Sequence, residues 1–215
     1  MLRSPLPFVR FGVKEAWYDM HRKDCFLMAL ALDRRKQYSD DDIIELTRLY
    51  PALRFERSAA GELIVAPPTG MSTGRRNSSL LVQLGEWNRR RGLGELYDSS
   101  TGFHLPDGSL LSPDVSWVER SRVEGIPEEE REKFALLCPD VVFELSSPSD
   151  KPAALRKKMR AYVRNGAKLA VLILVAERIV ERHRPTGCIV SPNPTRLEFD
   201  PELPGCVLDF DEILE

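Results

Sequence analysis

Two apolar, strand-like segments of this sequence each carry one carboxylate. Asp114 follows Pro113 within residues 112–118, and Glu144 closes an apolar run within residues 139–148. β-branched and aromatic residues favour strands, and a charge inside such a segment needs a partner. A hard divalent cation suits two converging carboxylates, because it takes oxygen ligands and keeps water or phosphate in its coordination shell. The pair predicts a Mg²⁺ site, with Mn²⁺ as the alternative ion; for either acid alone, the alternative is a turn cap or a solvated strand end.

A helical pattern downstream adds a candidate lysine. Its apolar residues recur at helical spacing and form a stripe of Leu155, Met159, Tyr162 and Val163. Because successive helical residues are rotated by about 100°, Lys158 lies at the edge of this stripe and Lys157 points away. Lys158 is therefore a candidate partner of the two carboxylates. The alternative is a lysine that lays its aliphatic stem over the core and keeps its ammonium in water.

Several separated strings resemble, in order, the Uma-two family of endonucleases. They are residues 61–70, 98–103, 112–114, 138–140 and 144–147. The resemblance extends from about Leu32 to the C-terminus. That family belongs to the restriction-endonuclease-like superfamily, whose signature is Pro-Asp, a spacer, then Asp or Glu, one residue, and Lys. The resemblance implies an α/β fold with a restriction-endonuclease-like core, a mixed β-sheet flanked by helices. It also implies a divalent metal, DNA as substrate and a homodimer.

The chain departs from the superfamily signature at one position. Ser146 stands two residues after Glu144, where the signature has its lysine. The family pattern has a Lys-Met pair that matches Lys158 and Met159, so the resemblance implies that Lys158 is a catalytic lysine moved to the helix. It also matches Glu62, which follows Gly61, to a Gly-Glu of the family; the alternative for Glu62 is a charge on an edge strand.

These assignments define a predicted site and three functions. Asp114, Glu144 and the backbone carbonyl of Leu145 are the predicted metal ligands, and Lys158 and Glu62 join the two acids as catalytic residues. The leading hypothesis is a Mg²⁺-dependent endonuclease that hydrolyses DNA phosphodiester bonds. The second is a catalytically inactive nuclease-fold module for DNA binding or dimerisation. A third is a metal-dependent hydrolase of a smaller phosphate ester.

Composition limits the alternatives. A chain of 215 residues with 42% hydrophobic content suits one core, and a net charge of −2 argues against non-specific coating of nucleic acid. No apolar run reaches the roughly 20 residues of a membrane span, so a cytoplasmic location is expected. Cysteines and histidines are scattered along the sequence, which indicates neither a disulfide framework nor a zinc or histidine-based metal centre. They are Cys25, Cys138, Cys188, Cys206, His21, His104 and His183.

The first 27 residues lack a sustained hydrophobic period. We therefore expect residues 1–27 to be a non-core extension, with Met28 as the true start, and residues 28–215 to form a single restriction-endonuclease-like domain. The rival interpretation is a genuine arm that packs through Phe8, Phe11 and Trp17.

Periodicity and turn residues predict the order of elements. Helices are expected over residues 40–49 after the N-cap Ser39, from residue 72 or 73 to just before Gly92, over 127–133, and up to Gly166. Strands are expected over residues 53–57, 62–65, 95–97, 102–105, 114–118, 141–143, 169–175 and 178–184.

Overall fold

A six-stranded mixed sheet forms the centre of the computed structural model, which describes residues 37–215. The predicted extension 1–27 and the proposed start at Met28 lie outside the described residues. The strands occur in the order β11-β10-β9-β8-β6-β3; β8 and β9 are parallel and the other neighbours are antiparallel. Their bounds are β3 Gly94–Asp98, β6 Val115–Glu119, β8 Val141–Leu145, β9 Leu169–Leu174, β10 Ile179–Arg184 and β11 Gly187–Pro192.

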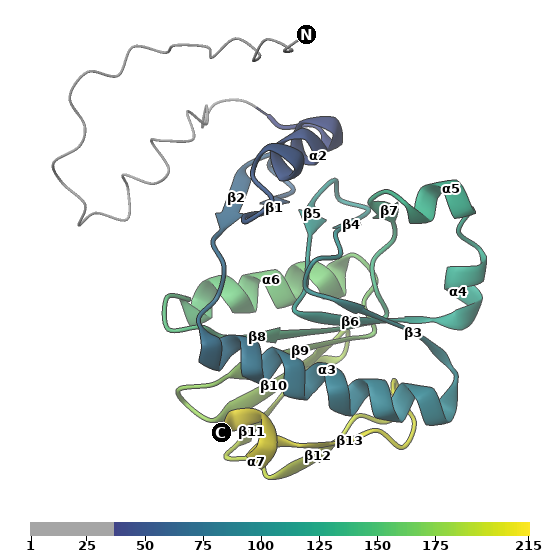
Figure 1. Ribbon diagram of the computed structural model, residues 1–215. Coiled ribbons are helices and arrows are strands. Elements are labelled where there is room, and N and C mark those ends of the chain that lie inside the picture. Colours follow the sequence, from purple (N-terminus) through teal and green to yellow (C-terminus); the bar gives the residue numbers. More distant parts are fainter. Residues whose placement is uncertain (1–36) are drawn as a thin grey trace, which may run out of the picture. The chain divides into compact units, whose positions relative to one another are not determined.

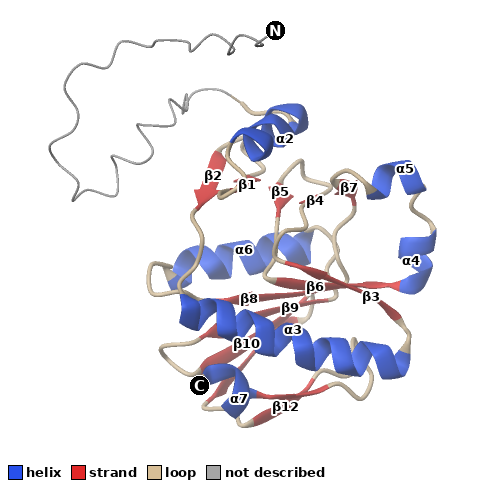
Figure 2. Ribbon diagram, viewed as in Figure 1, coloured by secondary structure: helices blue, strands red, loops and turns tan. Residues whose placement is uncertain are grey.

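Helices cover both faces of this sheet (Figures 1 and 2). On one face, α3 (Met71–Arg91) and α7 (Phe210–Leu214) pack against alternate residues of the central strands, such as Phe143 of β8 and Val171 of β9. On the other face, α6 (Pro152–Arg164) packs Met159 and Tyr162 against Val142 and Leu172. Side chains alternate between the two faces of a strand, so both faces of β8 and β9 are buried, as their apolar sequences predict.

A second, five-stranded sheet has the order β2-β1-β5-β4-β7. Its strands are β1 Arg54–Arg57, β2 Leu63–Ala66, β4 Phe103–His104, β5 Leu110–Leu111 and β7 Ala135–Leu136. The predicted hairpin is confirmed as β1 and β2, which pair antiparallel. The remaining elements are α2 Asp40–Leu49, α4 Arg120–Glu124, α5 Glu128–Arg131, β12 Arg196–Glu198 and β13 Val207–Asp209, the last two forming a two-stranded sheet.

The helix ends follow the predicted signals. Ser39 Oγ accepts from the backbone N–H of Asp42 at 3.2 Å, and the Asp42 carboxylate accepts from the N–H of Ser39 at 2.8 Å, which makes a capping box at the start of α2. At the end of α3, Gly92 adopts a left-handed conformation with φ 62°. Among residues 37–215, no helix is both long enough and apolar enough to span a membrane. The mixed α/β architecture that the resemblance implies is confirmed.

Candidate metal-dependent active site

The two predicted metal ligands come from neighbouring strands of the central sheet. Glu144 lies in β8 on the face that α6 covers, because its neighbours Phe143 and Leu145 belong to the cluster on the opposite face. Asp114 immediately precedes β6, whose first residue Val115 pairs with Phe143. The order of β8 and β6 therefore brings both carboxylates to one edge of the sheet.

Both carboxylates are buried. Asp114 is 7% and Glu144 4% exposed, so neither is a solvated strand end. Asp114 Oδ2 accepts from the backbone N–H of Leu145 at 2.9 Å. The N–H and C=O of one strand residue point to the same side, so the Leu145 carbonyl faces the side of Asp114 as well. The three predicted metal ligands therefore lie together.

Lys158 reaches this cluster from α6. Its Nζ lies 2.7 Å from Glu144 Oε1 and 2.9 Å from Glu56 Oε1, and its side chain is only 17% exposed. The helical spacing therefore predicted the direction of this side chain correctly. A lysine that lays its stem over the core and keeps its ammonium in water would not bury the ammonium between two carboxylates, so the structure excludes that alternative.

The third carboxylate of the cluster is Glu56, which the sequence analysis missed. Glu56 lies in β1, where its Oε1 also accepts from the backbone N–H of Ser112 at 2.8 Å. Glu62 lies at the turn of the same hairpin, just before β2 and exposed to solvent, where its carboxylate accepts from Ser58 Oγ at 3.4 Å. The hairpin thus brings Glu56 to the cluster and leaves Glu62 apart from it.

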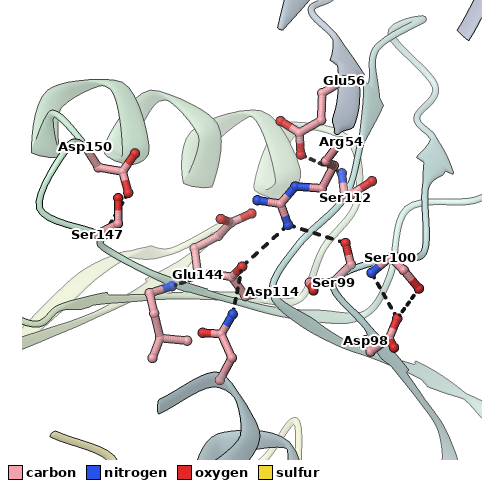
Figure 3. Close-up of polar contacts among 12 residues, drawn as sticks. Arg54, Glu56, Asp98, Ser99, Ser100, Ser112, Asp114, Glu144, Ser147 and Asp150 are labelled. Atoms are coloured by element: carbon pink, nitrogen blue, oxygen red, sulfur yellow. Dashed lines mark hydrogen bonds and ion pairs between the residues drawn. The ribbon is translucent and has the colours of Figure 1, made fainter. Parts of the chain in front are cut away.

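Two further side chains that the sequence analysis missed contact Asp114. Arg54, also from β1, places Nη1 3.6 Å from Asp114 Oδ1 and donates to the carbonyl of Ser99 at 3.3 Å. Figure 3 shows its guanidinium beside the carboxylates of Asp114 and Glu144. Asn77 of α3 donates to Asp114 Oδ1 at 3.4 Å. The only signal in the sequence was the alternation of Arg54 and Glu56 about a buried Phe55, which is also typical of an ordinary half-exposed hairpin.

The cluster contains both carboxylates and cations, and the carboxylates are in excess. Among the described residues it combines the carboxylates of Glu56, Asp114 and Glu144 with the cations Arg54 and Lys158, so full ionisation leaves one negative charge in excess. Burial raises the pKa of Glu144 to about 8; Lys158 opposes this rise, and Asp114 and Glu56 add to it. Burial would lower the pKa of Lys158, but Glu144 and Glu56 outweigh it and the pKa is raised.

These properties fit a divalent cation. The excess negative charge and the all-oxygen donors, which are carboxylates and a backbone carbonyl, match the preference of Mg²⁺ and Mn²⁺. A cation at Asp114 and Glu144 would favour the ionised form of Glu144. The donor set therefore suits the metal that the resemblance implies.

Ser146, which replaces the lysine of the superfamily signature, has a structural role. Its Oγ accepts from the backbone N–H of Val175 at 2.9 Å, and its own N–H donates to the carbonyl of Ile173 at 2.9 Å. The position therefore ties the end of β8 to β9. The ammonium beside Glu144 comes from α6 instead.

Comparisons with known proteins agree with this architecture. No curated protein matches the chain in sequence. The crystal structure of a "putative nuclease" from Anabaena variabilis ATCC 29413 superposes with a TM-score of 0.64 at 19% identity, covering 74% of this chain and 89% of that one. At this identity the likeness shows the fold. The model of the Uma2, or Uma-two, family, described as "Putative restriction endonuclease", matches residues 41–211. The chain therefore belongs to the Uma2 family.

Proposed function

We propose that this protein is a metal-dependent endonuclease that hydrolyses phosphodiester bonds in DNA. The observation that carries the proposal is the convergence of Asp114, Glu144 and Glu56 with the Lys158 ammonium in one buried cluster. Buried carboxylates that leave an excess negative charge are unfavourable unless a cation joins them. The family description and the nuclease-like fold support the same chemistry.

Each residue of the cluster has a proposed role. Asp114, Glu144 and the carbonyl of Leu145 would hold Mg²⁺ or Mn²⁺, which supplies a Lewis acid for the phosphate and an activated water. Lys158 would orient the attacking water or stabilise the charge that develops on the phosphate. Glu56 holds the ammonium of Lys158 in place from the opposite side, through the 2.9 Å ion pair. Arg54 is the second cation that can face a phosphate.

Exposed basic residues near the cluster would bind the DNA backbone. Arg160 and Arg164 lie on the exposed side of α6, and Arg75 is exposed in the first turns of α3. Both helices also contribute to the cluster, α6 through Lys158 and α3 through Asn77. A few such contacts suit a protein of net charge −2 that binds DNA at a local site rather than along its whole surface.

The competing proposal is an inactive nuclease-fold module. The replacement of the signature lysine by Ser146 favours it. The position of Lys158 favours an active enzyme, because its ammonium contacts Glu144, the acid that precedes the lysine in the superfamily signature. The homodimer and the cytoplasmic location stay predictions.

Cleavage assays separate these proposals. The purified chain is incubated with supercoiled plasmid, linear duplex and single-stranded DNA, in Mg²⁺, in Mn²⁺ and in chelator. An endonuclease nicks or linearises the closed plasmid only when the divalent ion is present. An inactive module binds DNA in a mobility-shift assay and leaves every substrate intact. A hydrolase of small phosphate esters cleaves a chromogenic phosphodiester and leaves all three DNA substrates intact.

A further inference from the structure

A second group of metal-type side chains lies on the β10–β11 hairpin. Glu181, His183 and Cys188 each offer one ligand atom, and these three atoms lie within 4.8 Å of one another. The scattered positions of histidine and cysteine in the sequence indicated no metal centre built from them. The hairpin overcomes that separation, since His183 of β10 is the cross-strand partner of Cys188 in β11.

The strand pattern explains why the three side chains share a face. In β10, Val180 belongs to the cluster on the α3 face, so its neighbour Glu181 and, two residues on, His183 point to the α6 face. Directly opposed residues of neighbouring strands have their side chains on the same face, which brings in Cys188. Glu181 and His183 are buried, whereas Cys188 is exposed, so the group opens to solvent on the side of β11.

We infer that Glu181 Oε2, His183 Nε2 and Cys188 Sγ form a binding site for a borderline divalent ion such as Zn²⁺. A tetrahedral zinc with bonds of about 2.0–2.3 Å holds its ligand atoms roughly 3.3–3.7 Å apart. His183 Nε2 lies 3.0 Å from Glu181 Oε2 and 3.7 Å from Cys188 Sγ. Two of the three separations are therefore close to the tetrahedral values already, and the third needs a shift of about 1 Å at most.

Arg156 of α6 orients the carboxylate of this site and bonds mainly to the oxygen that does not face His183. Its Nη2 and Nε donate to Glu181 Oε1 at 2.6 and 2.9 Å, and Nε approaches Oε2 at a longer 3.2 Å. Oε1 is thus the main partner of the guanidinium, and Oε2 faces His183. Carboxylates that bind metals are commonly held by such outer hydrogen bonds. Three protein ligands leave the fourth position to water.

This site is separate from the Asp114 cluster and differs from it in chemistry. Glu181 pairs with Leu172 of β9, and Leu172 pairs with Glu144 of β8. Two strand spacings place the two glutamates about 10 Å apart along the sheet, too far for the roughly 3.5–4 Å of a two-metal centre. Sulfur and imidazole ligands select zinc-like ions, whereas the all-oxygen Asp114 cluster selects Mg²⁺ or Mn²⁺.

Cobalt spectroscopy on the full chain tests this inference without reference to nuclease activity. Co²⁺ is the probe, because a cobalt–thiolate bond gives a charge-transfer band that oxygen ligands do not produce. We expect the wild-type chain to show this band and tetrahedral visible bands with one Co²⁺ per chain, and expect Zn²⁺ to abolish them. Excess Mg²⁺ should leave them unchanged.

Matched cysteine variants locate the thiolate. Cys188→Ser should remove the band, whereas Cys25→Ser, which lies outside the described residues, should retain it. Cys138 and Cys206 are buried elsewhere in the core. His183→Ala should weaken Co²⁺ binding by at least tenfold, a loss typical of an altered metal ligand set. Because β11 is exposed, the metal-free melting temperature of Cys188→Ser should lie within a few degrees of the wild-type value. Zn²⁺ should raise the melting temperature of the wild type and should not raise that of Cys188→Ser.

Three results would overturn the inference. They are a wild-type chain that shows no thiolate band in excess Co²⁺, a band that survives in Cys188→Ser, and Co²⁺ affinity unchanged in His183→Ala. Each would reduce the group to a polar network in which Arg156 and His183 simply hydrogen-bond to Glu181.

Discussion

Replacement of Asp114 by asparagine separates the catalytic role of this residue from its structural one. An asparagine keeps one carbonyl oxygen to accept from the N–H of Leu145, which Asp114 Oδ2 now accepts at 2.9 Å. It loses the contacts at Oδ1, which are the pairing with Arg54 at 3.6 Å and the long hydrogen bond from Asn77 at 3.4 Å; both are weak and together contribute about 1 kcal/mol. It also removes repulsion between Asp114 and Glu144, which acts in the opposite direction.

These two effects nearly cancel in the free energy of unfolding. We expect a net change within about 1 kcal/mol, which shifts the melting temperature of a chain of this size by roughly 2–4 °C or less. The activation barrier should change more, because losing one preorganised electrostatic group raises it by about 2.7–4 kcal/mol, equivalent to a 100- to 1,000-fold lower rate. The assays are single-turnover plasmid cleavage in Mg²⁺ and thermal unfolding in chelator.

Asp140 provides the matched control, because it is also a buried aspartate that follows a proline. It is buried, accepts from the N–H of Glu119 at 2.9 Å, and pairs with Arg122 at 2.9 Å and Lys168 at 3.0 Å. Asp140→Asn should lower stability by about 1–3 kcal/mol and leave cleavage unchanged at a temperature where the chain is folded. If Asp114→Asn instead destabilises the fold and cleaves at the wild-type rate, Asp114 is a structural residue and the proposed site is wrong.

Three further predictions follow from the same cluster. Lys158→Ala should reduce cleavage by about 100-fold or more, and Lys157→Ala, on the exposed side of α6, by less than about threefold; equal small effects would favour the inactive module. Glu56→Gln should reduce the cleavage rate by roughly tenfold or more because it releases Lys158, while Glu62→Gln should leave the rate unchanged. A larger loss of cleavage in Glu62→Gln than in Glu56→Gln would show that Glu62 belongs to the site. Burial raises the pKa of Glu144 from 4.5 to about 8, so the folded chain binds this proton more tightly than the unfolded chain does. The free energy of unfolding without metal should therefore fall as pH rises between these two values. Urea unfolding at several pH values should show a smaller decline in Glu144→Gln, and an equally steep decline in this variant would contradict the assignment.

Local signals in the sequence predicted much of the fold. The acids after Ser39 predicted the start of α2, the glycine after the arginines at 89–91 predicted the end of α3, and the apolar run at 141–143 predicted β8. The sequence patterns did not predict β5, β7, β11, β12, β13 or the short helices α4 and α7. Most of these are only two to five residues long, so they are too short to show a hydrophobic period of their own.

In the candidate site too, residues with a local sequence signal were predicted and residues placed by distant contacts were not. The ends of apolar strands revealed Asp114 and Glu144, and the helical stripe revealed the direction of Lys158. Glu56 could not be found in this way, because its role depends on a contact with Lys158 that spans 102 residues of sequence. The hairpin that carries Glu56 also carries Glu62, and only the tertiary contacts of Glu56 with Lys158 and Ser112 distinguish the two.

The most direct test of the proposed function is the Mg²⁺ dependence of cleavage of a closed circular plasmid by the purified full chain. The proposal predicts nicked and linear products in Mg²⁺, and intact plasmid both in chelator and with the Asp114→Asn chain in Mg²⁺. A folded wild-type chain that binds the plasmid and leaves it intact in both Mg²⁺ and Mn²⁺ would contradict it.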